Sequence, residues 1–69
     1  MEQGMEVNTV MVEALRLARE QARRRARDAG AKVSLVEARV WHALAYDMVA
    51  AQPGHWEQLA KLSLARGAR

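Results

Sequence analysis

A stripe of small apolar residues between positions 11 and 29 constrains the fold of this chain more than any other feature. The stripe consists of Met11, Ala14, Ala18, Ala22, Ala26 and Ala29. Its steps average 3.6 residues, the period of an α-helix, so the stripe follows one helical face. Because alanine side chains are short, another helix can approach this face closely. We therefore predict a long helix over residues 9–29 that packs through its alanine face.

The ends of this helix carry residues that favour helix boundaries. Asn8 and Thr9 are both suitable N-cap residues. Gly30 follows the last alanine of the stripe and can adopt the left-handed conformation that ends many helices. Residues 1–7 are expected to fray.

A second helix is predicted over residues 34–52. Ser34 and Glu37 have the spacing of a capping box, and Pro53 disfavours helical backbone at the residue before it. The expected apolar ridge consists of Trp41, Leu44, Met48 and Ala51. Since flanking valines and alanines widen this ridge beyond what one neighbour would cover, we expect this helix to be the central one.

A third helix is predicted over residues 55–66, after a tight turn at the sequence QPGH, with residues 67–69 frayed. Pro53 and Gly54 suit the two central positions of a type II turn. The chain contains no strand pattern, repeat or linker. The predicted fold class is all-α, a single small domain made of a helical hairpin with a third short C-terminal helix.

The composition favours association of two copies. The 69 residues include 14 alanines, three aromatic residues, no phenylalanine and no cysteine. Alanine buries little apolar area, and chains of this size often depend on a partner subunit for stability. We therefore expect a helical homodimer. Its seam, or a seam between helices of one chain, would use Ala14, Ala18, Ala22, Ala26, Trp41, Leu44 and Met48.

Arginines dominate the charge of the first predicted helix. Residues 14–27 contain six arginines against Glu20, and the whole chain carries a net charge of +3. The ridge opposite the alanines consists of Arg16, Arg19, Arg23 and Arg27. The spacing also predicts ion pairs with acidic residues three or four positions away, namely Glu13 with Arg16, Glu20 with Arg23 and Arg24, and Asp28 with Arg24. A solvated face, a phosphate-binding face and a face for an acidic protein remain three interpretations of this ridge.

No motif indicates catalysis, a metal or a cofactor. Thr9, Ser34 and Ser63 are the only hydroxyl nucleophiles other than Tyr46, and no histidine is placed beside one by the sequence. A site built from His42, Asp47, His55 and Glu57 would need residues that do not share a helical face. We expect no enzyme activity. Charges interrupt every apolar run, which indicates no membrane span and favours a cytoplasmic location.

The functional prediction follows from these exclusions. Arg39, His42 and Tyr46 share the less apolar face of the second predicted helix, and tyrosine and arginine are frequent in binding hot spots. We therefore predict a small regulator or adaptor that binds another protein of unknown identity through these three residues. Its composition is typical of bacterial, phage or mobile-element accessory proteins. The alternative is a nucleic-acid-binding regulator that uses the arginine ridge.

Overall fold

The computed structural model describes residues 2–67, with side chains from residue 9 onward. Three α-helices make up most of it: α1 (Glu2–Asp28), α2 (Ala38–Ala51) and α3 (Pro53–Gly67). A 3₁₀ turn at Val33–Leu35 lies between α1 and α2. No strand occurs in the described part of the chain, so the all-α prediction is confirmed. Helix α3, at 15 residues, is not shorter than α2, at 14.

Helix α1 is longer than its predicted range because it begins at Glu2. Asn8 and Thr9 therefore lie inside the helix and do not cap it. The sequence before them contains no proline, and Gly4 alone does not stop a helix that is already propagating. Residues 2–7 and residue 67, which were expected to fray, are helical, whereas residues 1, 68 and 69 fall outside the described residues.

The C-terminal end of α1 forms as predicted around Gly30, whose φ is +89°. The Gly30 N–H donates to the Arg27 carbonyl, and the Ala31 N–H donates to the Ala26 carbonyl, both at 2.9 Å. This pair of bonds is a Schellman motif, which satisfies carbonyls that the helix itself leaves free. Gly30 thereby directs the chain out of α1 toward α2.

The predicted capping box at Ser34 and Glu37 is wrong. Val33–Leu35 closes as a 3₁₀ turn, and Val36 is extended, with φ −87° and ψ 131°. Glu37 is also extended and is itself the N-cap of α2, without a side-chain cap bond. A capping box requires three helical residues after the serine, and the extended Val36 breaks that requirement. Helix α2 consequently begins at Ala38.

The predicted turn at Pro53 and Gly54 is also wrong, because both residues belong to α3. The break between α2 and α3 is confined to Gln52, with φ −142° and ψ 64°. The Trp56 N–H donates to the Gln52 carbonyl at 3.2 Å, the first bond of α3. Proline suits the first turn of a helix, where its missing N–H is not needed. Pro53 therefore starts α3.

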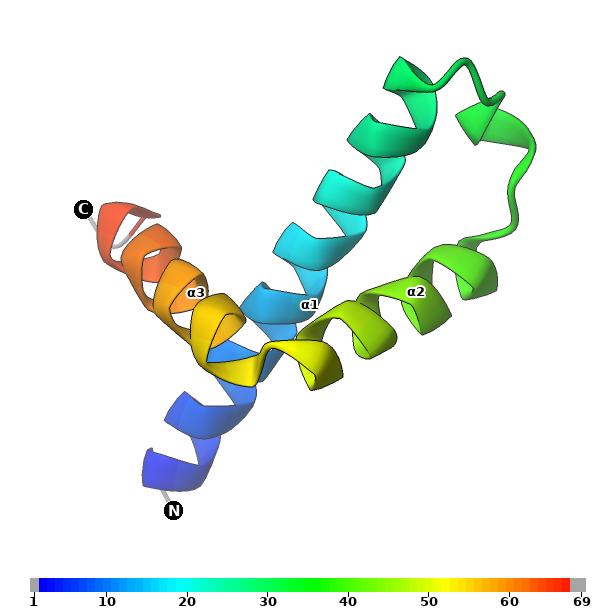
Figure 1. Ribbon diagram of the computed structural model, residues 1–69. Helices are drawn as coiled ribbons and strands as arrows, with labels where there is room; N and C mark the ends of the chain where they lie inside the picture. The colour runs from blue at the N-terminus through cyan, green and yellow to red at the C-terminus, as the bar shows by residue number, and fades with distance from the viewer. Residues whose placement is uncertain (1, 68–69) are drawn as a thin grey trace.

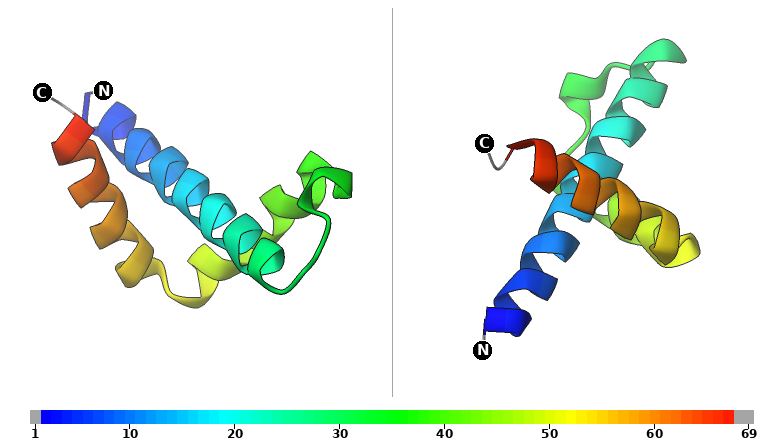
Figure 2. Two further views of the ribbon diagram at one scale, coloured as in Figure 1. Left: turned by 90° about the horizontal axis from the view of Figure 1, so that it is seen from above. Right: turned by 90° about the vertical axis from the view of Figure 1, so that its left-hand side faces the viewer.

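Helix α1, and not α2 as predicted, is the central element. Helices α2 and α3 both pack against α1 and touch each other little. In Figure 1, α2 returns from the far end of α1 toward its middle, and the chain then bends sharply into α3. Figure 2 shows α3 crossing α1 at a steep angle. Two flanks of α1 are therefore covered, by one helix each.

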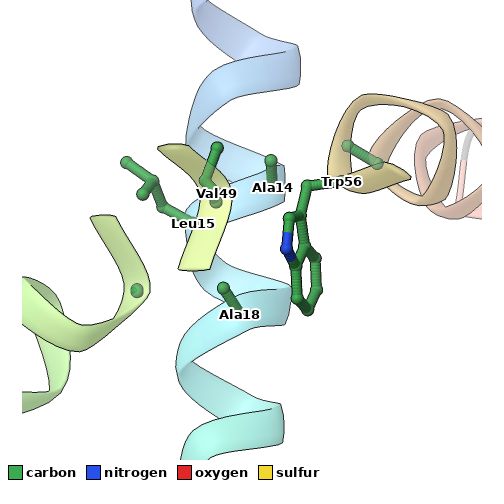
Figure 3. Close-up of a cluster of buried hydrophobic side chains, with 7 residues drawn as sticks. Ala14, Leu15, Ala18, Val49 and Trp56 are labelled. Carbon is green, nitrogen blue, oxygen red and sulfur yellow. The ribbon is translucent and has the colours of Figure 1, made fainter. Parts of the chain in front are cut away.

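The core lies where the three helices meet and is made largely of small residues. Its buried members are Ala14, Leu15, Ala18, Ala45, Val49, Trp56 and Ala60. Figure 3 shows the Trp56 indole extending from α3 along α1 beside Ala14 and Ala18. Ala18, Ala45 and Ala60 are completely inaccessible to solvent. Short side chains at these positions let the helices approach closely around the Trp56 ring.

Candidate functional site

The residues of the predicted seam are buried to different extents within the chain. Ala14, Ala18 and Trp41 are buried, whereas Ala22, Ala26 and Met48 are half-buried. Leu44 is 42% exposed, because α2 turns Trp41, Ala45 and Val49 inward in its place. The middle of the stripe, at Ala14 and Ala18, thus packs against helices of the same chain.

Packing of α2 against α1 brings an arginine of the ridge next to the face of α2 expected to bind a partner. Arg19 Nη1 lies 3.3 Å from His42 Nδ1. Since arginine can only donate, this hydrogen bond requires His42 to accept through Nδ1. The His42 ring also meets the Tyr46 ring edge-on, with centroids 4.9 Å apart and an interplanar angle of 81°. We refer to Arg19, His42 and Tyr46 as the Arg19–His42–Tyr46 cluster.

The local sequence explains why these three side chains meet. His42 and Tyr46 are four residues apart on α2 and so project from the same flank. On α1, Arg19 follows the completely buried Ala18, and its side chain therefore leaves the helix at the edge of the contact with α2. Arg19 and His42 are 23 residues apart, so helical spacing alone could not predict their contact.

Arg39, the third predicted member of the partner-binding face, is not in contact with the cluster. Its Nε lies 3.1 Å from Glu37 Oε2, and its side chain is 81% exposed. It extends the same flank of α2 toward the start of that helix. Tyr46 is 51% exposed, so the flank presents an accessible aromatic ring on the same helix as the exposed Arg39.

Two of the four arginines of the ridge interact with neighbouring side chains. Arg16 pairs with Glu13 and Glu20, both at 2.7 Å, and Arg19 contacts His42. Among the described residues, Arg23 and Arg27 form no ion pair and remain exposed. Half of the predicted nucleic-acid face is therefore occupied by neighbours within the chain.

The other predicted pairs show a mixed outcome. The expected Glu13–Arg16 pair is confirmed. Glu20 lies 3.9 Å from Arg24, as expected. No ion pair joins Glu20 to Arg23 or Asp28 to Arg24 in the described part of the chain.

A hydrogen-bonded link between α1 and α3 was not predicted from the sequence. Glu13 Oε2 accepts a bond from Ser63 Oγ at 2.5 Å and one from Arg16 Nη2 at 2.7 Å. Arg16 Nε donates to the other Glu13 oxygen at 2.9 Å. These bonds, first that of Arg16 and then that of Ser63, lower the pKa of Glu13 from its ordinary 4.5 to about 2. Ser63, a candidate nucleophile by residue type, therefore holds α3 to α1 through a carboxylate.

An open groove of about 510 Å³ lies between α3 and the second half of α1. Its apolar lining consists of Leu17, Trp56, Leu59 and Leu62, and its charged lining consists of Glu20, Arg24, Arg25, Asp28 and Arg66. Leu62 is 56% exposed and Leu59 37%. Sequence reasoning missed this groove because it depends on the direction in which α3 leaves Gln52.

The other chemical possibilities raised by the sequence find little geometric support. In the part of the chain that the structure describes, no three histidine, aspartate or glutamate side chains are arranged to hold a metal ion. His55 contacts the Trp56 ring edge-on, with centroids 5.2 Å apart. None of the described helices is both long and apolar enough to cross a membrane.

Comparison with known proteins gives no relative from which a role could be transferred. No protein-family model, curated protein or solved structure matches this chain.

Proposed function

We propose that this chain is a non-catalytic regulator or adaptor that binds another protein through the exposed flank of α2. The observation that carries the proposal is the Arg19–His42–Tyr46 cluster. It supports binding because a contact between two helices orders three side chains of the kinds that recognise partners, while Tyr46 stays 51% exposed.

The cluster has the physical properties of a binding anchor. Tyrosine and arginine are enriched among the residues that contribute most to protein interfaces. The edge-on contact with His42 already restricts the Tyr46 ring, so binding would cost less side-chain entropy than for a free ring. A partner that buries Tyr46 would gain apolar area and could accept a hydrogen bond from its hydroxyl.

The charge around the cluster favours an acidic segment as the part of the partner that is bound. Arg23 and Arg27 are exposed without an ion pair among the described residues, and Arg39 lies on the cluster's own flank of α2. Complementary charge at the edge of an interface mainly accelerates association and excludes unsuitable partners. The apolar and aromatic contacts would supply most of the affinity.

The test is an affinity purification from a lysate of the organism that encodes the chain, with and without nuclease. The tagged wild type, Tyr46→Ala and Val12→Ala would be compared. Val12 is a matched control because it is 64% exposed on α1 and outside the cluster. We expect a discrete protein that resists nuclease, binds Val12→Ala and is lost with Tyr46→Ala. Equal recovery with all three chains would refute the role of the cluster.

A second candidate function is nucleic-acid binding, which one observation favours. Packing of α2 places the His42 ring against Arg19, and the Tyr46 ring contacts His42 in turn, so the arginine ridge is followed by aromatic rings that the α1 sequence lacks. Exposed aromatic rings beside arginines can stack on the bases of single strands. Two further arginines of the ridge, Arg23 and Arg27, are available to phosphates.

This candidate predicts a specific response to salt. If Arg23 and Arg27 each neutralise a phosphate of a single-stranded oligonucleotide, Arg23→Gln/Arg27→Gln should reduce the slope of log affinity against log salt by about 1.4. Tyr46→Ala should weaken binding by ~1–3 kcal/mol per stacked base. Titration of a fluorescent oligonucleotide at several salt concentrations measures both effects. An unchanged slope would exclude the ridge as a phosphate contact.

A further inference from the structure

Four apolar side chains line the groove between α3 and the second half of α1. Trp56 and Leu17 line it together with Leu59 and Leu62, and the last two remain substantially exposed. The groove thus carries exposed leucines in its own lining. Such a groove can be self-complementary, because a two-fold axis brings the exposed leucines of each copy to the groove of the other.

The exposed area of the whole chain is larger than is typical of a monomer of its mass. The chain exposes 5532 Å², whereas a monomeric protein of 7.7 kDa typically exposes roughly 4,300 Å². Its radius of gyration is 13.1 Å, against about 11 Å for a compact domain of this length. The excess exposed area of roughly 1,200 Å² is larger than the ~800 Å² that each partner buries in a stable interface.

The charges around the groove identify the kind of occupant. They are of both signs: Arg25 and Arg66 lie near Asp28 and Glu20 in the lining. Arg25, Asp28 and Arg66 form no ion pair within the described residues. A second copy, related by a two-fold axis, would supply both a carboxylate for Arg25 and Arg66 and arginines for Asp28.

We infer that the groove between α1 and α3 is the interface of a two-fold symmetric homodimer, in which Leu62 of each copy packs toward the groove of the other. Ala14 and Ala18 of the alanine stripe are buried inside each chain, whereas Leu62 is 56% exposed at the groove. The Arg19–His42–Tyr46 cluster lies outside the groove, and the inference is therefore independent of the proposed function.

Analytical ultracentrifugation of the full chain tests this inference, over a concentration range from about 1 μM to 1 mM. We expect a monomer–dimer equilibrium in the wild type. Leu62→Asp should raise the dimer dissociation constant at least about 30-fold, because it places a charge in an apolar contact. Val12→Asp is the matched control, since Val12 is also exposed but lies outside the groove. A monomer throughout this range, or equal loss of the dimer in both variants, would overturn the inference.

A second measurement avoids dependence on a disruptive variant. The chain contains no cysteine, so Leu62→Cys and Val12→Cys each provide one attachment point for a spin label. Dipolar coupling between labels in two copies should appear at position 62 as the concentration rises, with a distance short enough for a direct contact. Coupling that is absent at position 62, or confined to position 12, would place the interface elsewhere.

Discussion

The link between Glu13 and Ser63 gives the sharpest test of how α3 is held to α1. Ser63→Ala removes one hydroxyl and leaves the rest of the side chain in place. The lost bond is the 2.5 Å hydrogen bond to a carboxylate whose side chain is only 13% exposed. Ser34→Ala is the matched control, because Ser34 is exposed and its side chain caps no helix. The prediction concerns the free energy of unfolding of both variants.

The expected loss follows from the chemistry of this bond. Hydrogen bonds to charged groups contribute ~1.5–3 kcal/mol. Arg16 still donates two bonds to Glu13 after the substitution, so the carboxylate is not left unpaired, and the lower end of this range applies. We therefore expect Ser63→Ala to lose about 1.5 kcal/mol, which lowers the melting temperature of a domain of this size by roughly 6–12 °C. Ser34→Ala should change stability by less than ~0.5 kcal/mol.

The same link predicts how stability depends on pH. The folded state lowers the pKa of Glu13 from 4.5 to about 2, so the unfolded state binds the proton more readily. The stabilisation by ionised Glu13 is therefore fully present above about pH 4.5 and is lost as the pH falls through about 2. Its upper limit is about 3 kcal/mol, reduced by the solvent exposure of Arg16.

Urea denaturation followed by tryptophan fluorescence, at pH 7 and at several values down to pH 2, measures these effects. The difference between the wild type and Glu13→Gln should shrink over this range. The double variant Glu13→Gln/Ser63→Ala should lose less than the sum of the two single losses. Additive losses, or a wild-type advantage over Glu13→Gln that is the same at pH 2 and pH 7, would refute the ionic link between α1 and α3.

Two further predictions concern the backbone and the core. Gly30→Ala should lower the free energy of unfolding, measured by urea denaturation, by ~1–2 kcal/mol, because Gly30 has a left-handed φ of +89°. Gly54 lies within α3, and a Cβ added there meets no nearby atoms, so Gly54→Ala should leave the free energy of unfolding unchanged or raise it by up to ~1 kcal/mol. A loss at Gly54 equal to that at Gly30 would contradict this account. Ala18→Leu should overpack the completely buried contact of α1 and lower the free energy of unfolding by ~1–3 kcal/mol, whereas Ala43→Leu, at an exposed site on α2, should have little effect. An unchanged melting temperature for Ala18→Leu would refute close packing at the alanine stripe.

Features that depend on residues close together along the chain were predictable from the sequence. The period of the alanine stripe predicted α1. That helix ends at Gly30, where the Gly30 N–H donates to the Arg27 carbonyl and the Ala31 N–H donates to the Ala26 carbonyl. Helix spacing likewise predicted the pair between Glu13 and Arg16. In each case the partners lie within about five positions, where helix geometry alone fixes their relative placement.

Local sequence patterns gave wrong predictions where the same residues fit two backbone conformations. The spacing of Ser34 and Glu37 fits a capping box, yet the chain closes a 3₁₀ turn there and stays extended at Val36. Pro53 fits the turn position and the first turn of a helix equally well, and it occupies the second. The exposed connections make few contacts that would favour one backbone conformation over the other. Their conformation therefore depends on the path that the chain must take between the packed helices.

Which faces of α1 and α2 are buried depends on contacts between residues far apart in the sequence. The arc of α2 is too wide for one neighbour, and its register on α1 buries Trp41 and Ala45 while leaving Leu44 exposed. That register places Arg19 against His42, and the bend at Gln52 places Ser63 against Glu13, 50 residues away. Contacts across such separations depend on helix directions that no periodicity encodes. They follow from how the small core closes around Trp56.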